Sequence, residues 1–205
     1  MSHEKVFIGT AMAILQALAC VAAVAAEARS WSFEMEAAGS TPSNFEFAVT
    51  GQKQPGKWVI AKQGNNLVLA QIDRDKTERR FAMALIRGAT YKDLRLSVRA
   101  KPIAGEVERV AGLGRRYKDP DNYYVARWNT DSVRVDRVIN GERQLLTPSE
   151  IKTTLAEKQW HTLTVEHRGD DIKVLVDGKR VFAGSDKTYA DAGKIGVWIK
   201  ADSMT

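Results

Sequence analysis

The sequence has 205 residues, of which 31 are lysine or arginine and 25 are aspartate or glutamate, so its formal net charge is +6. Its single cysteine, Cys20, lies near the N-terminus, which leaves the rest of the chain without a disulfide, a thiolate metal site or a cysteine nucleophile. The basic residues alternate with apolar ones along many short segments rather than clustering. This pattern argues against nucleic-acid binding.

The first residues predict an export signal peptide over residues 1–28. Lys5 precedes an apolar run over residues 6–26, and small residues in Ala-x-Ala spacing follow at 23–25 and 26–28. The run is long enough to span a bilayer, so an uncleaved anchor is the alternative, but alanine-rich segments insert less strongly than leucine-rich ones. We therefore expect cleavage, no stable membrane insertion afterwards, and a periplasmic or secreted protein.

Residues 29–205 predict one domain with a sizeable core, built almost entirely of β-strands. Many short apolar-alternating segments, separated by turn signals, are typical of an antiparallel β-sandwich or barrel. The expected strands cover residues 45–49, 57–62, 67–72, 81–86, 93–100, 108–117, 123–129, 133–139, 142–146, 160–167, 172–176, 179–183 and 194–200. Only residues 148–158 could form a short helix.

The clearest of these signals lies in residues 160–182, which predict three antiparallel strands in a row. Leu163 and Val165 alternate with polar residues, and residues 169–171 turn the chain. Asp177 and Gly178 then provide the two positive-φ positions of a type I′ hairpin turn. The segment therefore predicts a β-meander.

The last predicted strand, residues 194–200, is followed only by residues 201–205. In a sandwich a further strand would normally pair beside it. We therefore expect either that a final strand is missing from this sequence or that the strand leaves an exposed edge.

Several motifs together resemble exported bacterial domains of the concanavalin A-like lectin/glucanase superfamily. They are Gly112-Leu-Gly-Arg-Arg-Tyr-Lys-Asp-Pro-Asp-Asn-Tyr-Tyr-Val-Ala-Arg-Trp-Asn129, Trp160-His-Thr-Leu-Thr-Val165, Val176-Asp-Gly-Lys179 and Asp191-Ala-Gly-Lys-Ile-Gly-Val-Trp198. The similarity is greatest to laminin-G-like jelly rolls and to the family named for 3-keto-disaccharide hydrolase. It covers residues 31–205 and implies a jelly-roll β-sandwich of the concanavalin A type.

The densest aromatic and polar cluster lies in the predicted strand 123–129. Alternation places Tyr123, Arg127 and Asn129 on one face of the sheet and Tyr124 and Trp128 on the other, where they suit the core. A flat aromatic ring on the first face would stack on a sugar, while arginine and asparagine bind its hydroxyls. Arg116 and Arg134, on neighbouring strands, are candidates for the same surface. In the alternative, Arg127 pairs with Asp136 or another strand acid on a solvated face.

The turn at Asp119, Asp121 and Asn122 offers oxygen ligands, and the resembled superfamily often carries a structural Ca²⁺. A calcium site needs six to eight oxygens, and turn formation explains the same residues without a metal. We expect no other cofactor.

The favoured function is carbohydrate recognition by an exported module. The alternative is a hydrolase or lyase acting on 3-keto disaccharides or other glycans, with Arg127, Asp136 and Glu108 as candidate catalytic groups. Glycosidases related to laminarinases would carry two glutamates flanking an aspartate on one strand, and this sequence lacks that motif. A third interpretation is an adhesion or structural module that binds protein, which a flat apolar surface would favour.

Overall fold

The structure is a computed structural model that describes residues 28–52 and 54–205. It divides into two units, Met1–Trp31 and Ser32–Thr205, and the second is described here. The predicted leader, apart from its last position, lies outside the described residues. The described residues contain strands and turns but no helix, and thus no helix long and apolar enough to cross a membrane.

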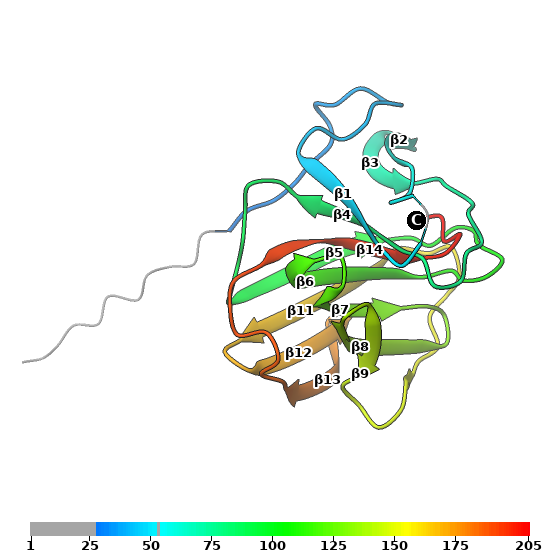
Figure 1. Cartoon of the computed structure of the whole chain (residues 1–205). Coiled ribbons are helices and arrows are strands. Elements are labelled where there is room, and N and C mark those ends of the chain that lie inside the picture. The colour runs from blue at the N-terminus through cyan, green and yellow to red at the C-terminus, as the bar shows by residue number, and fades with distance from the viewer. Residues whose placement is uncertain (1–27, 53) are drawn as a thin grey trace, which may run out of the picture. The chain divides into compact units, whose positions relative to one another are not determined.

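Fourteen strands make up the unit, and the prediction of an almost entirely β protein is confirmed (Figure 1). They are β1 (Phe45–Thr50), β2 (Trp58–Gln63), β3 (Asn66–Gln71), β4 (Phe81–Ile86), β5 (Leu94–Ala100), β6 (Ala111–Asp119), β7 (Asn122–Trp128), β8 (Ser132–Ile139), β9 (Glu142–Leu145), β10 (Ile151–Lys152), β11 (His161–Arg168), β12 (Asp171–Val176), β13 (Lys179–Ser185) and β14 (Lys194–Lys200). Every predicted strand is present, with ends that differ by at most a few residues.

An eight-stranded antiparallel sheet is the larger layer. Its strands run in the order β1-β4-β14-β6-β7-β8-β10, with β9 also pairing with β8. β14 lies inside this sheet, between β4 and β6. The expectation that the last strand leaves an exposed edge is therefore wrong, because strands from distant parts of the sequence pair with both of its sides.

A four-stranded sheet, in the order β13-β12-β11-β5, forms the facing layer. Residues 160–182 supply its meander as predicted, and Asp177 and Gly178 have φ angles of 48° and 79° at the hairpin turn. Asn140 and Gly141, with φ angles of 49° and 80°, make the equivalent turn between β8 and β9.

The main core lies between these two sheets. Tyr124 and Trp128 of β7 point into it, as alternation predicts, and pack with Leu163 and Val165 of β11. A short β2–β3 hairpin packs on β1, where Trp58 stacks on Phe47 with ring centroids 6.5 Å apart.

The segment predicted to be a short helix, residues 148–158, instead contains the two-residue strand β10 and turns. Ile151 pairs with Val133 of β8, and Leu155 donates its backbone N–H to the Thr130 carbonyl. Pairing with the edge of the sheet outweighs the weak helical preference of this stretch. The segment also brings Glu150 to the sheet.

Candidate functional site

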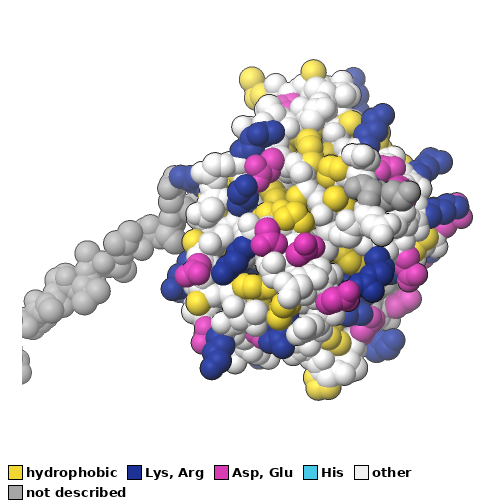
Figure 2. Space-filling model, in the orientation of Figure 1, with side chains coloured by type: hydrophobic (Ala, Val, Ile, Leu, Met, Phe, Trp, Pro, Cys, Tyr) yellow, Lys and Arg dark blue, Asp and Glu magenta, His cyan; other side chains and the backbone are white. Residues whose placement is uncertain are grey.

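The face of the eight-stranded sheet that points away from the four-stranded sheet, here called the open face, carries a group of charged residues. Alternation along β7 and β8 places Arg127, Arg134 and Asp136 on this face, opposite Tyr124 and Trp128. Figure 2 shows that acidic and basic side chains are interspersed over the side of the protein seen there. The open face is therefore charged around Arg127, Arg134 and Asp136, beside a second hydrophobic cluster on the same face that includes Val125, Val138 and Trp198.

Three ion pairs connect these side chains. Arg134 contacts Asp136 at 2.9 Å and Glu150 at 3.0 Å, and Arg127 contacts Glu150 at 3.4 Å. Although partial burial acts to raise it, a hydrogen bond with Ser132 and the charges of both arginines hold the pKa of Glu150 below its ordinary value. Glu150 is therefore a carboxylate. The alternative pairing of Arg127 with Asp136 or another strand acid is not observed, because Arg127 pairs with Glu150 from the loop between β9 and β10.

Glu108 and Asn129 adjoin this network. Asn129 donates a hydrogen bond from Nδ2 to Glu108 Oε1 at 3.0 Å, and Lys200 Nζ lies 3.9 Å from Glu108 Oε2. Of the predicted site residues, five lie along the open face or its rim: Glu108, Arg127, Asn129, Arg134 and Asp136. Strand alternation found them because they lie on or beside regular strands.

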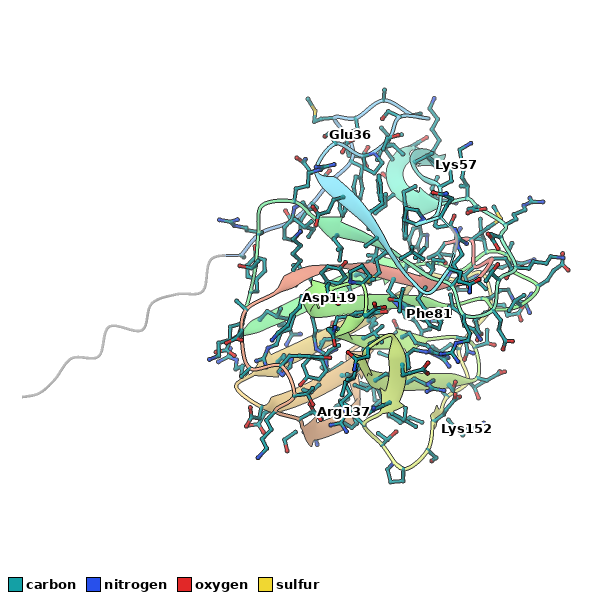
Figure 3. The ribbon with its side chains drawn as sticks, in the orientation of Figure 1. Glu36, Lys57, Phe81, Asp119, Arg137 and Lys152 are labelled. Carbon is teal, nitrogen blue, oxygen red and sulfur yellow. The ribbon has the colours of Figure 1, made fainter. Side chains whose placement is uncertain are left out.

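A pocket of about 200 Å³ opens on this face beside Arg134. Its walls are formed by Glu78, Arg79, Phe81, Arg134, Gly141, Glu142, Arg143 and Lys200. Phe81, labelled in Figure 3, begins β4, whereas Lys200 ends β14 and Arg143 comes from β9. Sequence reasoning identified only Arg134 among these residues. A local signal for Arg143 was present in the Asn140–Gly141 turn. This turn sets Arg143 opposite Val138, which alternates onto the same face as Arg134 and Asp136.

Arg143 forms the floor of the pocket above two stacked aromatic rings. Phe81 and Trp198 stack with centroids 5.3 Å apart, and the Arg143 guanidinium carbon lies 4.5 Å and 5.7 Å from their respective centroids. Its Nη1 atom is buried and has no hydrogen-bond partner among the described residues. Burial lowers the pKa of Arg143 from its ordinary value, and Arg134 acts in the same direction, although the charge of Asp136 acts to raise it.

Two predicted ligand-binding residues are placed differently. Tyr123 is fully buried, and its hydroxyl is hydrogen-bonded to Thr50 Oγ1 at 2.8 Å and to Trp198 Nε1 at 3.2 Å. The prediction that its ring stacks on a sugar is therefore wrong. Arg116 is also buried, with a φ of 45° at an irregularity in β6. Its guanidinium donates to three backbone carbonyls, including that of Tyr189 at 2.7 Å, and Nη2 lies 3.5 Å from Asp93 Oδ1. It fastens loops and does not contribute to the open face.

The predicted calcium turn is held by its own hydrogen bonds. Asp119 Oδ1 accepts from the backbone N–H of Asp121 at 2.8 Å and from Asn122 Nδ2 at 2.9 Å. Within residues 28–52 and 54–205, no group of three histidine, cysteine, aspartate or glutamate side chains is arranged to hold a metal ion. Calcium binding at this turn remains an untested prediction.

The two histidines of the described chain lie apart from the pocket. His161 Nδ1 contacts Asp177 Oδ2 at 2.7 Å. Burial acts to lower the pKa of His161, but this carboxylate and the Ala156 carbonyl together outweigh burial and raise it. His167 is fully buried between the sheets and accepts a hydrogen bond at Nδ1 from Arg115 Nε at 3.2 Å. Burial, followed by the charge of Arg115, lowers the pKa of His167 to about 3. His167 is therefore a neutral packing residue.

Several solved structures have folds similar to that of this chain. The chain is 20% identical to the carbohydrate-binding module CBM66 from Bacillus subtilis, with a TM-score of 0.61 over 80% of this chain and 94% of that one. A glycoside hydrolase family 16 protein from a Bacteroides ovatus mixed-linkage-glucan locus, solved with a G4G4G3G product, is 8% identical, with a TM-score of 0.56 over 81% and 82%.

A Bacillus subtilis protein of unknown function with a galectin-like fold is 11% identical, with a TM-score of 0.53 over 78% of this chain and 84% of that one. No protein-family model and no curated protein matches the sequence. The structural similarities show that the chain has the concanavalin A-like jelly-roll β-sandwich fold, which confirms the predicted fold class.

Proposed function

We propose that this β-sandwich binds carbohydrate in the pocket of its open face. The observation that carries the proposal is the pocket itself, which combines cationic donors and carboxylate acceptors on the sheet. Similar folds include a protein named as a carbohydrate-binding module and a glycoside hydrolase solved with an oligosaccharide product, which supports the same ligand class. The predicted leader adds a periplasmic or secreted location to the proposal.

The pocket suits a small part of a glycan. Its volume of about 200 Å³ is below the roughly 300–1,000 Å³ of pockets that enclose drug-sized ligands, so it fits a single sugar residue or a chain end. Arg134 and Lys200 can donate hydrogen bonds to hydroxyl oxygens, and Glu78 and Glu142 can accept from hydroxyl protons. Phe81 is almost fully buried against Arg143 and Trp198, so it supports the pocket wall from behind and offers a sugar ring little surface for stacking.

Ion pairing holds some of these side chains before a ligand arrives. Arg134 is fixed by Asp136 and Glu150, so little side-chain entropy is lost when it binds a hydroxyl. The same pairing favours binding over hydrolysis. A glycosidase needs one carboxyl group that is protonated near neutral pH, whereas the pKa of Glu150, which pairs with both Arg127 and Arg134, is lowered.

Thermal unfolding of the protein against neutral glycans, acidic glycans and 3-keto sugars, with product analysis for each sugar that binds, tests the proposal. A ligand at one hundred times its Kd stabilises the fold by about 2.7 kcal/mol. For a domain of this size that corresponds to a midpoint rise of roughly 5–11 °C. Product formation from a bound sugar would show instead that the protein is a hydrolase or lyase.

The Lys200→Met variant locates the site, because methionine keeps the chain length and removes the ammonium donor. We expect it to weaken binding about tenfold or more, the value of one charge-assisted hydrogen bond. Lys173→Met is the matched control, since Lys173 is exposed on β12 of the other sheet. Equal binding by both variants would move the site away from the pocket, and no response to any sugar would favour a protein-binding module.

A further inference from the structure

The charges of the residues that line the pocket are not balanced among themselves. Four of its lining residues are cationic and two are acidic, namely Arg79, Arg134, Arg143 and Lys200 against Glu78 and Glu142. The partners of each cation show which charges are already neutralised.

Two of the cations have acidic partners at the rim. Arg79 Nη2 is paired with Glu142 Oε1. Lys200 Nζ lies 3.9 Å from both Glu78 Oε1 and Glu108 Oε2. These four lining residues therefore offer hydrogen bonds to a ligand but little uncompensated charge.

Arg134 is compensated more strongly, because it contacts both Asp136 and Glu150. Arg143 differs from the other three cations. No carboxylate of the described residues lies within ion-pair distance of it, and its Nη1 is buried without an acceptor. Its guanidinium is instead supported from below by the rings of Phe81 and Trp198.

A buried guanidinium nitrogen without an acceptor is costly, because it has lost water and gained no hydrogen bond. Asp136 and Glu108 attract the charge of Arg143 without contacting it. The aromatic rings offset part of this cost through cation–π attraction, but they leave the in-plane N–H donors unused. Those donors have the geometry that binds two oxygens of one carboxylate or sulfate side by side. A neutral sugar hydroxyl provides one oxygen and no charge.

We propose that the pocket selects an acidic sugar, with the carboxylate or sulfate oxygens of that sugar bound by the guanidinium of Arg143. This inference rests on the proposed carbohydrate-binding function and specifies its ligand class. The neighbouring ion-paired residues then bind the hydroxyls of the same sugar, and Arg143 discriminates against the uncharged form.

Matched pairs of probes test the selectivity in titration calorimetry at fixed salt concentration. The carboxylate pair is oligogalacturonate and its fully methyl-esterified form, and the sulfate pair is a dextran sulfate oligomer and the unsulfated dextran oligomer. We expect at least one acidic probe to bind tenfold or more tightly than its neutral partner. The pair that shows the preference identifies whether carboxylate or sulfate is the recognised group.

The Arg143→Gln variant removes the charge while keeping a polar side chain. It should reduce the acidic preference to about twofold or less and leave any neutral binding unchanged. Arg180→Gln makes the same charge change at an exposed position of β13 and should keep the full preference. Arg143→Lys keeps the charge but loses the paired planar donors, so it should weaken the acidic probe at least threefold even if the glutamine variant folds poorly.

The possible failures are distinguishable. Equal binding of acidic and neutral probes, with no effect of Arg143→Gln, would overturn the acidic-sugar inference and leave carbohydrate binding in place. An equal loss in the Arg143 and Arg180 variants would show a general charge effect and overturn the assignment to Arg143. No binding of these probes, or of any glycan in the wider panel, would overturn both proposals.

Discussion

Gly196 and Gly114 are paired across β14 and β6, yet alanine at the two positions should have very different consequences. A Cβ atom at Gly196 would lie 2.2 Å from the carbonyl oxygen of Ala84 and 2.8 Å from the Cα of Leu85, both backbone atoms of β4. A Cβ atom at Gly114 would meet nothing closer than Met83 Sδ at 3.8 Å. Neither glycine has a positive φ, so the difference is one of space alone.

The cost of Gly196→Ala follows from how far the strands must separate. Restoring a contact of about 3.0 Å requires a shift of roughly 0.8 Å, which would lengthen hydrogen bonds of ~2.9 Å to about 3.7 Å, beyond useful range. Loss of several β4–β14 bonds at about 1 kcal/mol each predicts a destabilisation of roughly 3–5 kcal/mol. Gly114→Ala should change stability by less than about 1 kcal/mol, and alanine restricts the unfolded chain in its favour.

Denaturant and thermal unfolding of the two single variants provide the measurement. For a domain of this size, Gly196→Ala should lower the midpoint by roughly 6–20 °C, while Gly114→Ala stays within about 4 °C of the parent. Similar midpoints for the two variants would refute the reasoning, because they would show that β4 and β14 are not packed as closely at Gly196 as the structure places them. The same packing sets the position of Lys200 and Trp198 at the pocket.

Three further predictions concern ionisable groups away from the pocket. The pKa of His167 is lowered to about 3, so the stability from its neutral form is present above about pH 6.5 and is lost as the pH falls toward 3, by up to about 5 kcal/mol. His167→Gln should flatten the unfolding free energy over that range, and NMR signals of the imidazole that titrate near pH 6 would contradict the burial. The pKa of His161 is raised, so its ion pair with Asp177 is fully formed below about pH 6.5 and is lost as the pH rises through the folded-state pKa. Because Asp177 is half-exposed, His161→Gln should lower the free energy of unfolding by less than about 1 kcal/mol. This loss should be measurable at about pH 6 and absent at about pH 9. Asp202→Ala should cost about 3 kcal/mol in urea unfolding, since its buried carboxylate accepts the backbone N–H groups of residues 106–108, and a loss below 1 kcal/mol would show that water replaces it.

The candidate site was only partly predictable from the sequence. Arg127, Arg134 and Asp136 were placed on one face because side chains alternate along a strand, which is a local rule. Alternation does not say how deeply a side chain is buried. It therefore offered Tyr123 as a stacking ring, whereas that ring is buried in the second hydrophobic cluster with Val125 and Trp198. Arg116 was misplaced for a related reason, because the irregularity in β6 interrupts the alternation there.

The pocket depends on pairings between strands that are far apart in the sequence. Phe81, Arg143 and Lys200 come from β4, β9 and β14, and only the strand order of the eight-stranded sheet brings them together. The pairing of β14 between β4 and β6 likewise removed the exposed edge expected from its position near the end of the sequence.

The sequence by itself determined the class of fold, the strand positions and the hairpin turns, because period-two alternation and positive-φ turn residues act over a few neighbouring residues. Tertiary structure decided which faces are buried, which acids neutralise which cations, and that Arg143 is left without a carboxylate. Those properties depend on the order of strands in the sheet, and strand order is set by the burial of the whole core rather than by any local pattern.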